Sequence, residues 1–172
     1  MSRFKSSIPN IFTFGNLACG VMSLLMTFEE NYMLASIFII CAALADRYDG
    51  RVARFLNVSS EIGKELDSLA DLVSFGVAPS ILIYNMYSLS EKGLLGYLLL
   101  LIFPLAGAYR LARYNVTSFD GVFTGIPITI AGMILAVFCL TSTYRLANLS
   151  VTLILVVLLS YLMVSKLSFK KV

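Results

Sequence analysis

The sequence has 172 residues, of which 59% are hydrophobic and 13% are charged, and its mean hydropathy is +0.88. This number of polar side chains is too small to cover a water-soluble globule. The composition therefore predicts an integral membrane protein. Histidine is absent, which excludes the usual general base and the usual zinc ligand. Any chemistry therefore depends on carboxylates, hydroxyls, Arg, Lys or metal ions, and we expect no nucleic-acid partner.

Apolar runs predict six membrane-spanning helices in a single domain that covers residues 1–172. A helical span needs about 20 predominantly apolar residues. The candidate runs are Ile11–Phe28, Tyr32–Leu44, Leu72–Tyr87, Gly93–Tyr109, Ile126–Leu140 and Ala147–Val164. The expected fold class is therefore an all-α polytopic membrane protein. We interpret the first run as a retained span and not a signal peptide, because it continues apolar past Gly20.

The basic residues are distributed unevenly among the connections between these spans. If the N-terminus lies in the cytoplasm, all but Lys92 and Arg145 of the 13 Lys and Arg residues fall on the cytoplasmic side. The positive-inside rule therefore predicts a cell-membrane protein with both ends of the chain facing the cytoplasm.

The second and third runs are too short to cross a bilayer by themselves. The second covers 13 residues, about 20 Å of helix, against a hydrocarbon core of about 30 Å. Both helices must therefore continue into the polar segment between them, residues 45–71, in which Ser59 and Ser60 indicate a turn. The sequence thus predicts a polar helical hairpin at the cytoplasmic membrane surface.

Four of the five aspartates of the chain lie in this hairpin. Asp46 and Asp49 are three residues apart, and Asp67 and Asp71 are four apart, so each pair projects from one helix face. Carboxylates this close repel one another unless a cation lies among them. Oxygen ligands without His or Cys favour Mg²⁺, Mn²⁺ or Ca²⁺. In the alternative interpretation the aspartates pair with nearby bases on a solvated surface, namely Arg47, Arg51, Arg54 and Lys64.

The spacing across the hairpin resembles the signature of the CDP-alcohol phosphatidyltransferase family. In this chain the signature reads Asp46-x2-Asp49-Gly50-x2-Ala53-Arg54-x8-Gly63-x3-Asp67-x3-Asp71. The resemblance implies six transmembrane helices, with the signature on the second and third, and a homodimer. It also implies transfer of a phosphatidyl group from a CDP-lipid to an alcohol, with release of CMP.

The resemblance further implies roles for individual residues. Two divalent ions, Mg²⁺ or Mn²⁺, would be held by Asp46, Asp49, Asp67 and Asp71, and Asp71 would also be the general base. The nucleotide would be bound by Gly50, Ala53, Arg54, Gly63, Asn16 and Thr13. Helix packing explains Gly63 equally well, and polar contacts between helices are an alternative for Asn16 and Thr13.

Three further segments, residues 67–79, 110–116 and 123–127, resemble the serine-transferring branch of the family. We therefore expect L-serine as the acceptor, with glycerol phosphate or inositol phosphate as alternatives, and diacylglycerol or an archaeal ether lipid as the lipid group. Arg110 and Arg113 are candidates to bind the serine carboxylate or the lipid phosphate, unless they only set topology. A divalent-cation transporter is a further alternative, because transporters also carry acidic residues within their spans.

Overall fold

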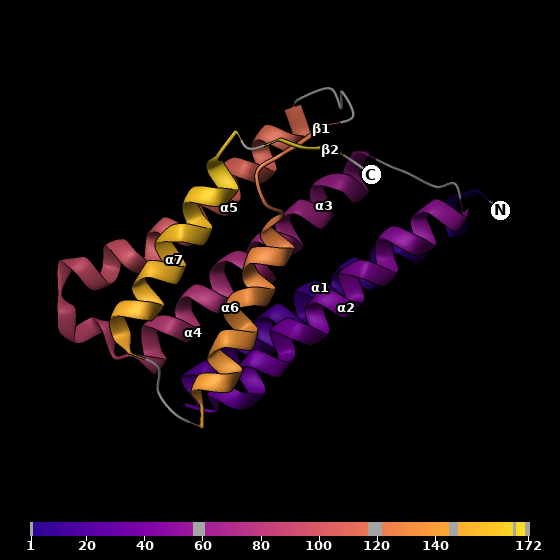
Figure 1. Ribbon diagram of the computed structural model, residues 1–172. Coiled ribbons are helices and arrows are strands. Elements are labelled where there is room, and N and C mark those ends of the chain that lie inside the picture. The colour runs from indigo at the N-terminus through magenta and orange to yellow at the C-terminus, as the bar shows by residue number, and fades with distance from the viewer. Residues whose placement is uncertain (1, 57–60, 117–121, 145–147, 167, 171–172) are drawn as a thin grey trace.

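The computed structural model describes residues 2–56, 61–116, 122–144, 148–166 and 168–170, and this part of the chain is a helical bundle (Figure 1). The elements are α1 (Ser2–Phe28), α2 (Tyr32–Leu56), α3 (Glu61–Asp71), the π-helix η1 (Leu72–Val77), α4 (Ala78–Met86), the 3₁₀-helix η2 (Leu89–Lys92), α5 (Leu94–Val116), β1 (Val122–Thr124), α6 (Ile128–Ser142), α7 (Leu149–Val164) and β2 (Ser168–Lys170). Since α3, η1 and α4 follow one another without a break, they form one helical rod.

The described helices agree with the six expected spans and extend several of them. The second helix, α2, continues from its apolar part to Leu56. The rod formed by α3, η1 and α4 begins at Glu61, well before its apolar part at Leu72. Both helices of the predicted polar hairpin are therefore present. The predicted turn at Ser59 and Ser60 lies outside the described residues.

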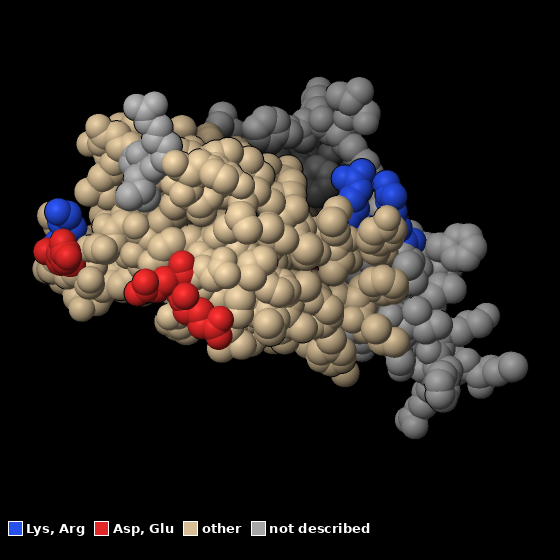
Figure 2. Space-filling view, turned by 90° about the horizontal axis from the view of Figure 1, so that it is seen from below, with Lys and Arg blue, Asp and Glu red and all other residues tan. Residues whose placement is uncertain are grey.

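Several of these helices are suited to a bilayer. Within the described residues, three stretches are long and apolar enough to cross it, Ile11–Phe28, Glu61–Met86 and Leu94–Val116, and α6 and α7 are shorter apolar helices. Figure 2 shows a largely uncharged surface on which the charged side chains form a few small groups. The protein is an integral membrane protein with an all-α fold.

The core is built around η1, the π-helical turn that directly follows Asp71. Helices from both sides approach it through glycines. A Cβ added to Gly20 of α1 would lie 2.4 Å from the Ser74 hydroxyl oxygen, and one added to Gly132 of α6 would lie 2.6 Å from the Phe75 carbonyl oxygen. Because neither space admits a methyl group, these glycines permit the close helix contacts that fix η1.

The strands β1 and β2 were not predicted from the sequence. They pair antiparallel, with Val122 opposite Lys170 and Thr124 opposite Ser168. Three-residue strands carry too little alternation to be recognised from a hydrophobic pattern. The pairing joins the segment before α6 to the segment after α7, and it leaves the bundle essentially helical.

Candidate active site

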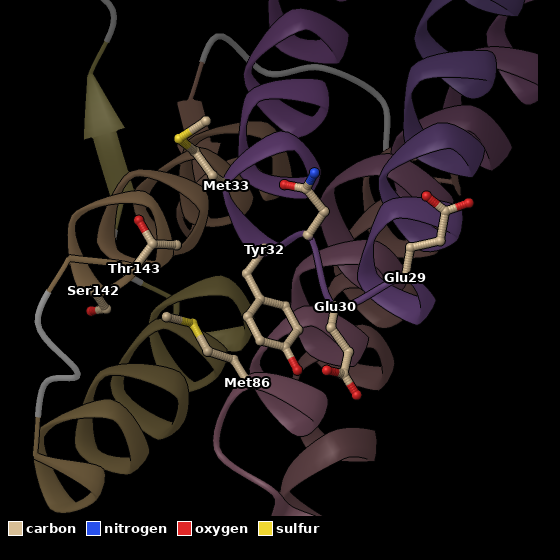
Figure 3. Close-up of a pocket in the computed structure, with 8 residues that line it drawn as sticks. Glu29, Glu30, Tyr32, Met33, Met86, Ser142 and Thr143 are labelled. Carbon is tan, nitrogen blue, oxygen red and sulfur yellow. The ribbon is translucent and has the colours of Figure 1, made fainter.

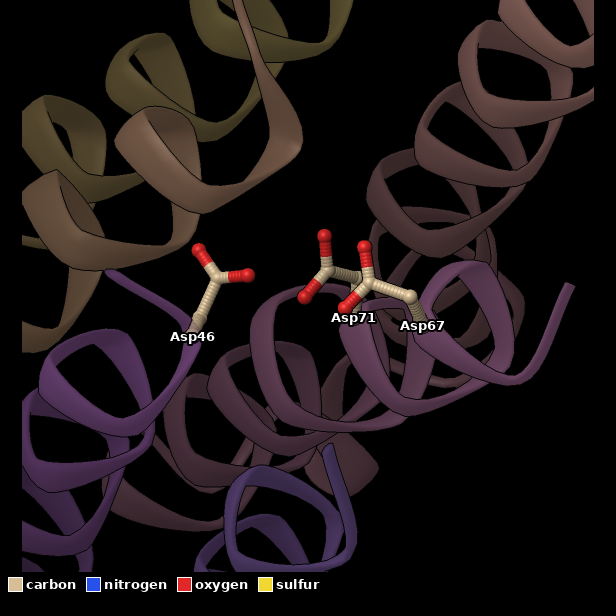
Figure 4. Close-up of side chains that lie close together, drawn as sticks. All are labelled: Asp46, Asp67 and Asp71. Atoms are coloured by element: carbon tan, nitrogen blue, oxygen red, sulfur yellow. The ribbon is translucent and has the colours of Figure 1, made fainter. Parts of the chain in front are cut away.

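Three carboxylates from two helices converge at one end of the bundle. Asp46 projects from α2, and Asp67 and Asp71 project from α3 toward it (Figure 4). One carboxylate oxygen from each residue lies within 4.8 Å of the others. Asp71 is buried, and Asp46 and Asp67 are half-buried. The four-residue spacing of Asp67 and Asp71 places both on one face of α3, as expected for a helix.

The donor set fits a hard divalent cation. Two oxygens that bind one Mg²⁺ at about 2.1 Å lie at most about 4.2 Å apart, so the carboxylates need only a small movement to share an ion. Among the described residues, no His or Cys joins the group. Carboxylates alone favour Mg²⁺, Mn²⁺ or Ca²⁺ over zinc. The chain thus holds an acidic triad that can bind such an ion, as the spacing predicted.

A hydrogen bond from α1 also holds Asp71. The Asn16 side-chain amide donates a 2.9 Å hydrogen bond from Nδ2 to Asp71 Oδ1. The Ser74 hydroxyl donates a 2.9 Å bond to the backbone oxygen of Asn16. The Arg110 guanidinium on α5 attracts the Asp71 carboxylate. An amide from α1 and a guanidinium from α5 therefore both interact with this carboxyl group.

The alternative of a solvated salt-bridge surface explains this arrangement poorly. Arg47, Arg51 and Lys64 are exposed, whereas Asp71 keeps only 8% of its surface exposed. Lys64 reaches toward α5, where its ammonium donates to the Asn115 backbone oxygen at 3.4 Å. Surface pairing with these bases does not account for a buried carboxylate that faces two others.

The predicted nucleotide residues are only partly described. Thr13 and Asn16 are buried on α1, three residues apart, and Gly63 is half-buried on α3, one turn before Asp67. The structure therefore brings Asn16 to the carboxylate group. The backbone of α2 continues through the remaining members of the signature, whose side chains lie outside the described part of the chain: Asp49, Gly50, Ala53 and Arg54.

Comparison with known proteins identifies the family of the chain that carries these carboxylates. The sequence profile of the family described as CDP-alcohol phosphatidyltransferase matches residues 6–167. The chain belongs to the CDP-alcohol phosphatidyltransferase family. The family match includes Asp46, Asp67 and Asp71, so the acidic triad lies within the region that this chain shares with the family.

Relatives within the CDP-alcohol phosphatidyltransferase family cover almost the whole chain. Three of them are named CDP-diacylglycerol--serine O-phosphatidyltransferase. The protein from Bacillus subtilis is 40% identical over 94% of this chain and 89% of its own length. The protein from Helicobacter pylori strain 26695 is 38% identical over 95% of this chain and 73% of its own. The protein from Methanocaldococcus jannaschii is 35% identical over 96% of this chain and 74% of its own.

The two arginines after the fourth span of this phosphatidyltransferase occupy different surroundings. Arg110 is half-buried, and its positive charge attracts the Asp71 carboxylate. Its guanidinium also lies 5.6 Å from the centre of the Tyr114 ring. The Arg113 guanidinium donates to the backbone oxygen of Val164 at 3.0 Å, at the end of α7. Arg113 thereby satisfies a carbonyl that the helix itself leaves unpaired.

Sequence reasoning missed Ser74 and Asn115 as residues near this family's signature. Asn115 of α5 donates from Nδ2 to the Ser68 hydroxyl at 3.0 Å and to Glu65 Oε1 at 3.3 Å. These bonds join α5 to α3 beside Asp67. The Asn115 position lies within the segment that resembles the serine-transferring branch, and that segment was the available signal. Ser74 also lies in such a segment, residues 67–79, but its contact with Asn16 depends on how α1 packs on η1.

A separate polar pocket lies at the other end of the phosphatidyltransferase bundle (Figure 3). It has a volume of about 580 Å³ and is lined by Glu29, Glu30, Asn31, Tyr32, Met33, Met86, Ser142 and Thr143. Along α2, Asp46 is 14 residues beyond Tyr32, a distance of about 21 Å. This pocket is therefore remote from the carboxylates.

Proposed function

We propose that this membrane enzyme transfers a phosphatidyl group, or its ether-lipid equivalent, from a CDP-lipid to L-serine and releases CMP, as a step of phospholipid biosynthesis. The convergence of Asp46, Asp67 and Asp71 carries the proposal, because these carboxylates could hold a divalent cation and lie within the region that matches the family. The names of the three relatives support serine as the acceptor.

The aspartates would hold two divalent ions, Mg²⁺ or Mn²⁺, with Asp49 as the fourth ligand residue. Such ions stabilise the negative charge of a diphosphate and of its leaving group. The residues themselves position these charges, because a carboxylate group fixed on two packed helices needs little reorganisation during the reaction. Gly50, Ala53, Arg54, Gly63 and Thr13 remain candidates to bind the nucleotide.

Asp71 is the proposed general base. Its carboxylate accepts the proton of the serine hydroxyl, and the serine oxygen forms a bond to the lipid-side phosphorus of the CDP-lipid. The bond from that phosphorus to the bridging diphosphate oxygen breaks, and CMP leaves with the electron pair. The burial of Asp71 and its fixed hydrogen bond to Asn16 suit a base that must act from one orientation.

Arg110 is the better placed of the two arginines to bind a substrate anion. Its charge attracts the Asp71 carboxylate, and a guanidinium binds a carboxylate or a phosphate through two parallel hydrogen bonds. Arg113 remains a candidate for the same role, although part of its guanidinium is committed to α7 through Val164 and Met163.

We place the carboxylate end of the bundle at the cytoplasmic surface of the cell membrane. All but Lys92 and Arg145 of the 13 basic residues belong to that side under this orientation. In Figure 1, α1 begins and α7 ends toward the same end of the bundle, which supports both termini on the cytoplasmic side. We further propose that the 172-residue chain is one domain and that it acts as a homodimer.

Isotope transfer tests the proposed reaction directly. Purified enzyme, CDP-diacylglycerol, Mn²⁺ and labelled serine should give label in the lipid extract and an equal amount of CMP. Asp71→Asn, which keeps the shape of the side chain and removes the base, should give neither product. Release of CMP without labelled lipid would contradict serine as the acceptor.

A further inference from the structure

We propose that Asn16 is a positioning residue that fixes the orientation of the Asp71 carboxylate, and that Ser74 and Gly20 hold Asn16 in place for this task. The inference rests on the proposed function and deepens it. It assigns Asn16 a role toward the metal site, in place of the nucleotide-binding role expected for it.

The geometry of the amide supports this role. Asn16 is fully buried, with 0% of its surface exposed. An ionised carboxylate only accepts hydrogen bonds, so the amide must turn Nδ2 toward Asp71, where the donor to acceptor distance is 2.9 Å. This bond occupies Oδ1 of Asp71 and opposes rotation of the carboxyl group. Asp71 therefore presents the same oxygen to a cation at each turnover.

The side-chain oxygen of Asn16 is less well satisfied than its nitrogen in this orientation. Among the described residues, the Asn16 Oδ1 atom is buried and has no hydrogen-bond partner. Leaving a buried acceptor without a hydrogen bond is unfavourable. The amide is therefore oriented by Asp71.

The backbone of Asn16 is anchored separately from its side chain. The Ser74 hydroxyl, one turn after Asp71 along the rod, donates to the Asn16 backbone oxygen at 2.9 Å. This contact depends on close approach of α1 and η1, which the missing side chain of Gly20 allows. Asp71 and Ser74 thus hold Asn16 at two points. These contacts fix α1 against the rod formed by α3, η1 and α4.

A positioning role and a nucleotide-binding role predict different kinetic effects. If Asn16 orients Asp71, its loss weakens binding of the divalent ion in the absence of nucleotide and lowers kcat. If Asn16 contacts the nucleotide, its loss raises the KM for CDP-lipid and leaves the metal affinity of the free enzyme unchanged. Partners of metal-ligating side chains typically contribute about 10-fold to 100-fold to metal affinity or activity.

The test compares Asn16→Leu with Ser74→Ala and with the control Ser23→Ala. Leu replaces the amide with an apolar side chain of similar size, and Ser74→Ala removes the second anchor without changing the amide. Ser23 is a matched control, because it is also fully buried on α1 and lies two turns from Asn16. Mn²⁺ affinity is measured by the electron paramagnetic resonance signal of free Mn²⁺, on detergent-purified full-length protein without substrate. Thermal unfolding checks that each variant is folded.

The expected result is a Mn²⁺ affinity about 10-fold or more below wild type in Asn16→Leu, a smaller loss in Ser74→Ala and none in Ser23→Ala. At saturating Mn²⁺, Asn16→Leu should show a lower kcat with a nearly unchanged KM for CDP-lipid. Wild-type Mn²⁺ affinity in Asn16→Leu would overturn the proposal, as would an equal loss in Ser23→Ala. If Asn16→Leu does not fold, wild-type Mn²⁺ affinity in Ser74→Ala overturns it.

The metal measurement is independent of the acceptor. If the wild-type enzyme binds Mn²⁺ but makes no lipid from serine, the proposed function fails and the comparison of Mn²⁺ affinities still decides the role of Asn16. If the wild-type enzyme transfers serine and Asn16→Leu keeps its Mn²⁺ affinity, the positioning role alone fails.

Discussion

Acidic residues occur at both ends of the bundle, but they converge at one end and are exposed at the other. Asp46, Asp67 and Asp71 come from two helices and bring their oxygens within 4.8 Å of one another. Glu29 and Glu30 are adjacent in the turn between α1 and α2, and both are exposed at the edge of the polar pocket. Asp46 lies 21 residues before Asp67, yet it meets the two aspartates of α3 because packed helices bring them together.

The difference follows from helix geometry and burial. Residues four apart share a helix face, so Asp67 and Asp71 point the same way and α2 supplies Asp46 to the same space. Exposed carboxylates such as Glu29 and Glu30 are in contact with water, which takes the place of a metal as their partner. Half-buried carboxylates that face one another need a counter-charge. We therefore expect catalysis at the aspartates and none at the glutamates.

Removing divalent ions should have the largest effect. Chelation with EDTA is expected to abolish CMP release, and added Mg²⁺ or Mn²⁺ should restore it, whereas Zn²⁺ should substitute poorly because no His or thiolate ligand joins the carboxylates. The measurement is initial CMP release across a metal titration. Full activity after exhaustive chelation would contradict a metal site at the aspartates.

Substitution at each end of the bundle makes the comparison directly. Asp46→Ala, Asp67→Ala and Asp71→Ala should each lower kcat by about 1,000-fold, near the upper limit for loss of one preorganised electrostatic group. Glu29→Gln and Glu30→Gln should keep wild-type turnover. Equal losses at the two ends would show that the convergence of the aspartates has no special role.

The arginines near the aspartates should separate into two classes. Arg110→Lys is expected to raise the KM for serine or CDP-lipid by about 10-fold to 150-fold, because a hydrogen bond to a charged group contributes about 1.5–3 kcal/mol. A lysine ammonium cannot replace the bidentate contact of a guanidinium. Arg113→Lys should mainly lower the unfolding temperature, because it loses the bond to Val164. A KM effect of equal size in Arg113→Lys would make both arginines substrate ligands.

The smallest expected effect concerns packing behind the aspartates. Gly20→Ala should destabilise the protein by about 1–3 kcal/mol, because the new Cβ would lie 2.9 Å from the Ser74 Cα atom. Gly15→Ala is the control, since a Cβ there meets nothing within 4 Å. Thermal unfolding in detergent measures both. Equal unfolding temperatures for the two variants would contradict the close contact of α1 with η1.

Much of this architecture was predictable because the bilayer restricts it. Apolar runs of helical length located the spans, and the shortness of Tyr32–Leu44 showed that its helix must continue through Asp46. The spacing of Asp67 and Asp71 predicted a shared face, and the family signature predicted the facing aspartate on α2. The spans and the shared helix face depend on local periodicity, which a single sequence carries, whereas the pairing with Asp46 came from resemblance to the family.

The missed features depend on contacts between helices. The bond from Asn16 to Asp71 joins residues 55 apart, and the bond from Ser74 to Asn16 joins residues 58 apart. The π-helical turn after Asp71 and the pairing of β1 with β2 have no distinct pattern of polar and apolar residues. Arg113 could be recognised as basic and membrane-proximal, but its bond to Val164 requires knowledge of where α7 ends.

The choice of acceptor tests the central claim most directly. Purified enzyme with CDP-diacylglycerol and Mn²⁺ is assayed for CMP release with L-serine, glycerol phosphate, inositol phosphate or no acceptor. We predict that only serine accelerates CMP release above the level without acceptor, and that Asp71→Asn removes this acceleration. Faster release with glycerol phosphate or inositol phosphate than with serine would contradict the proposed reaction.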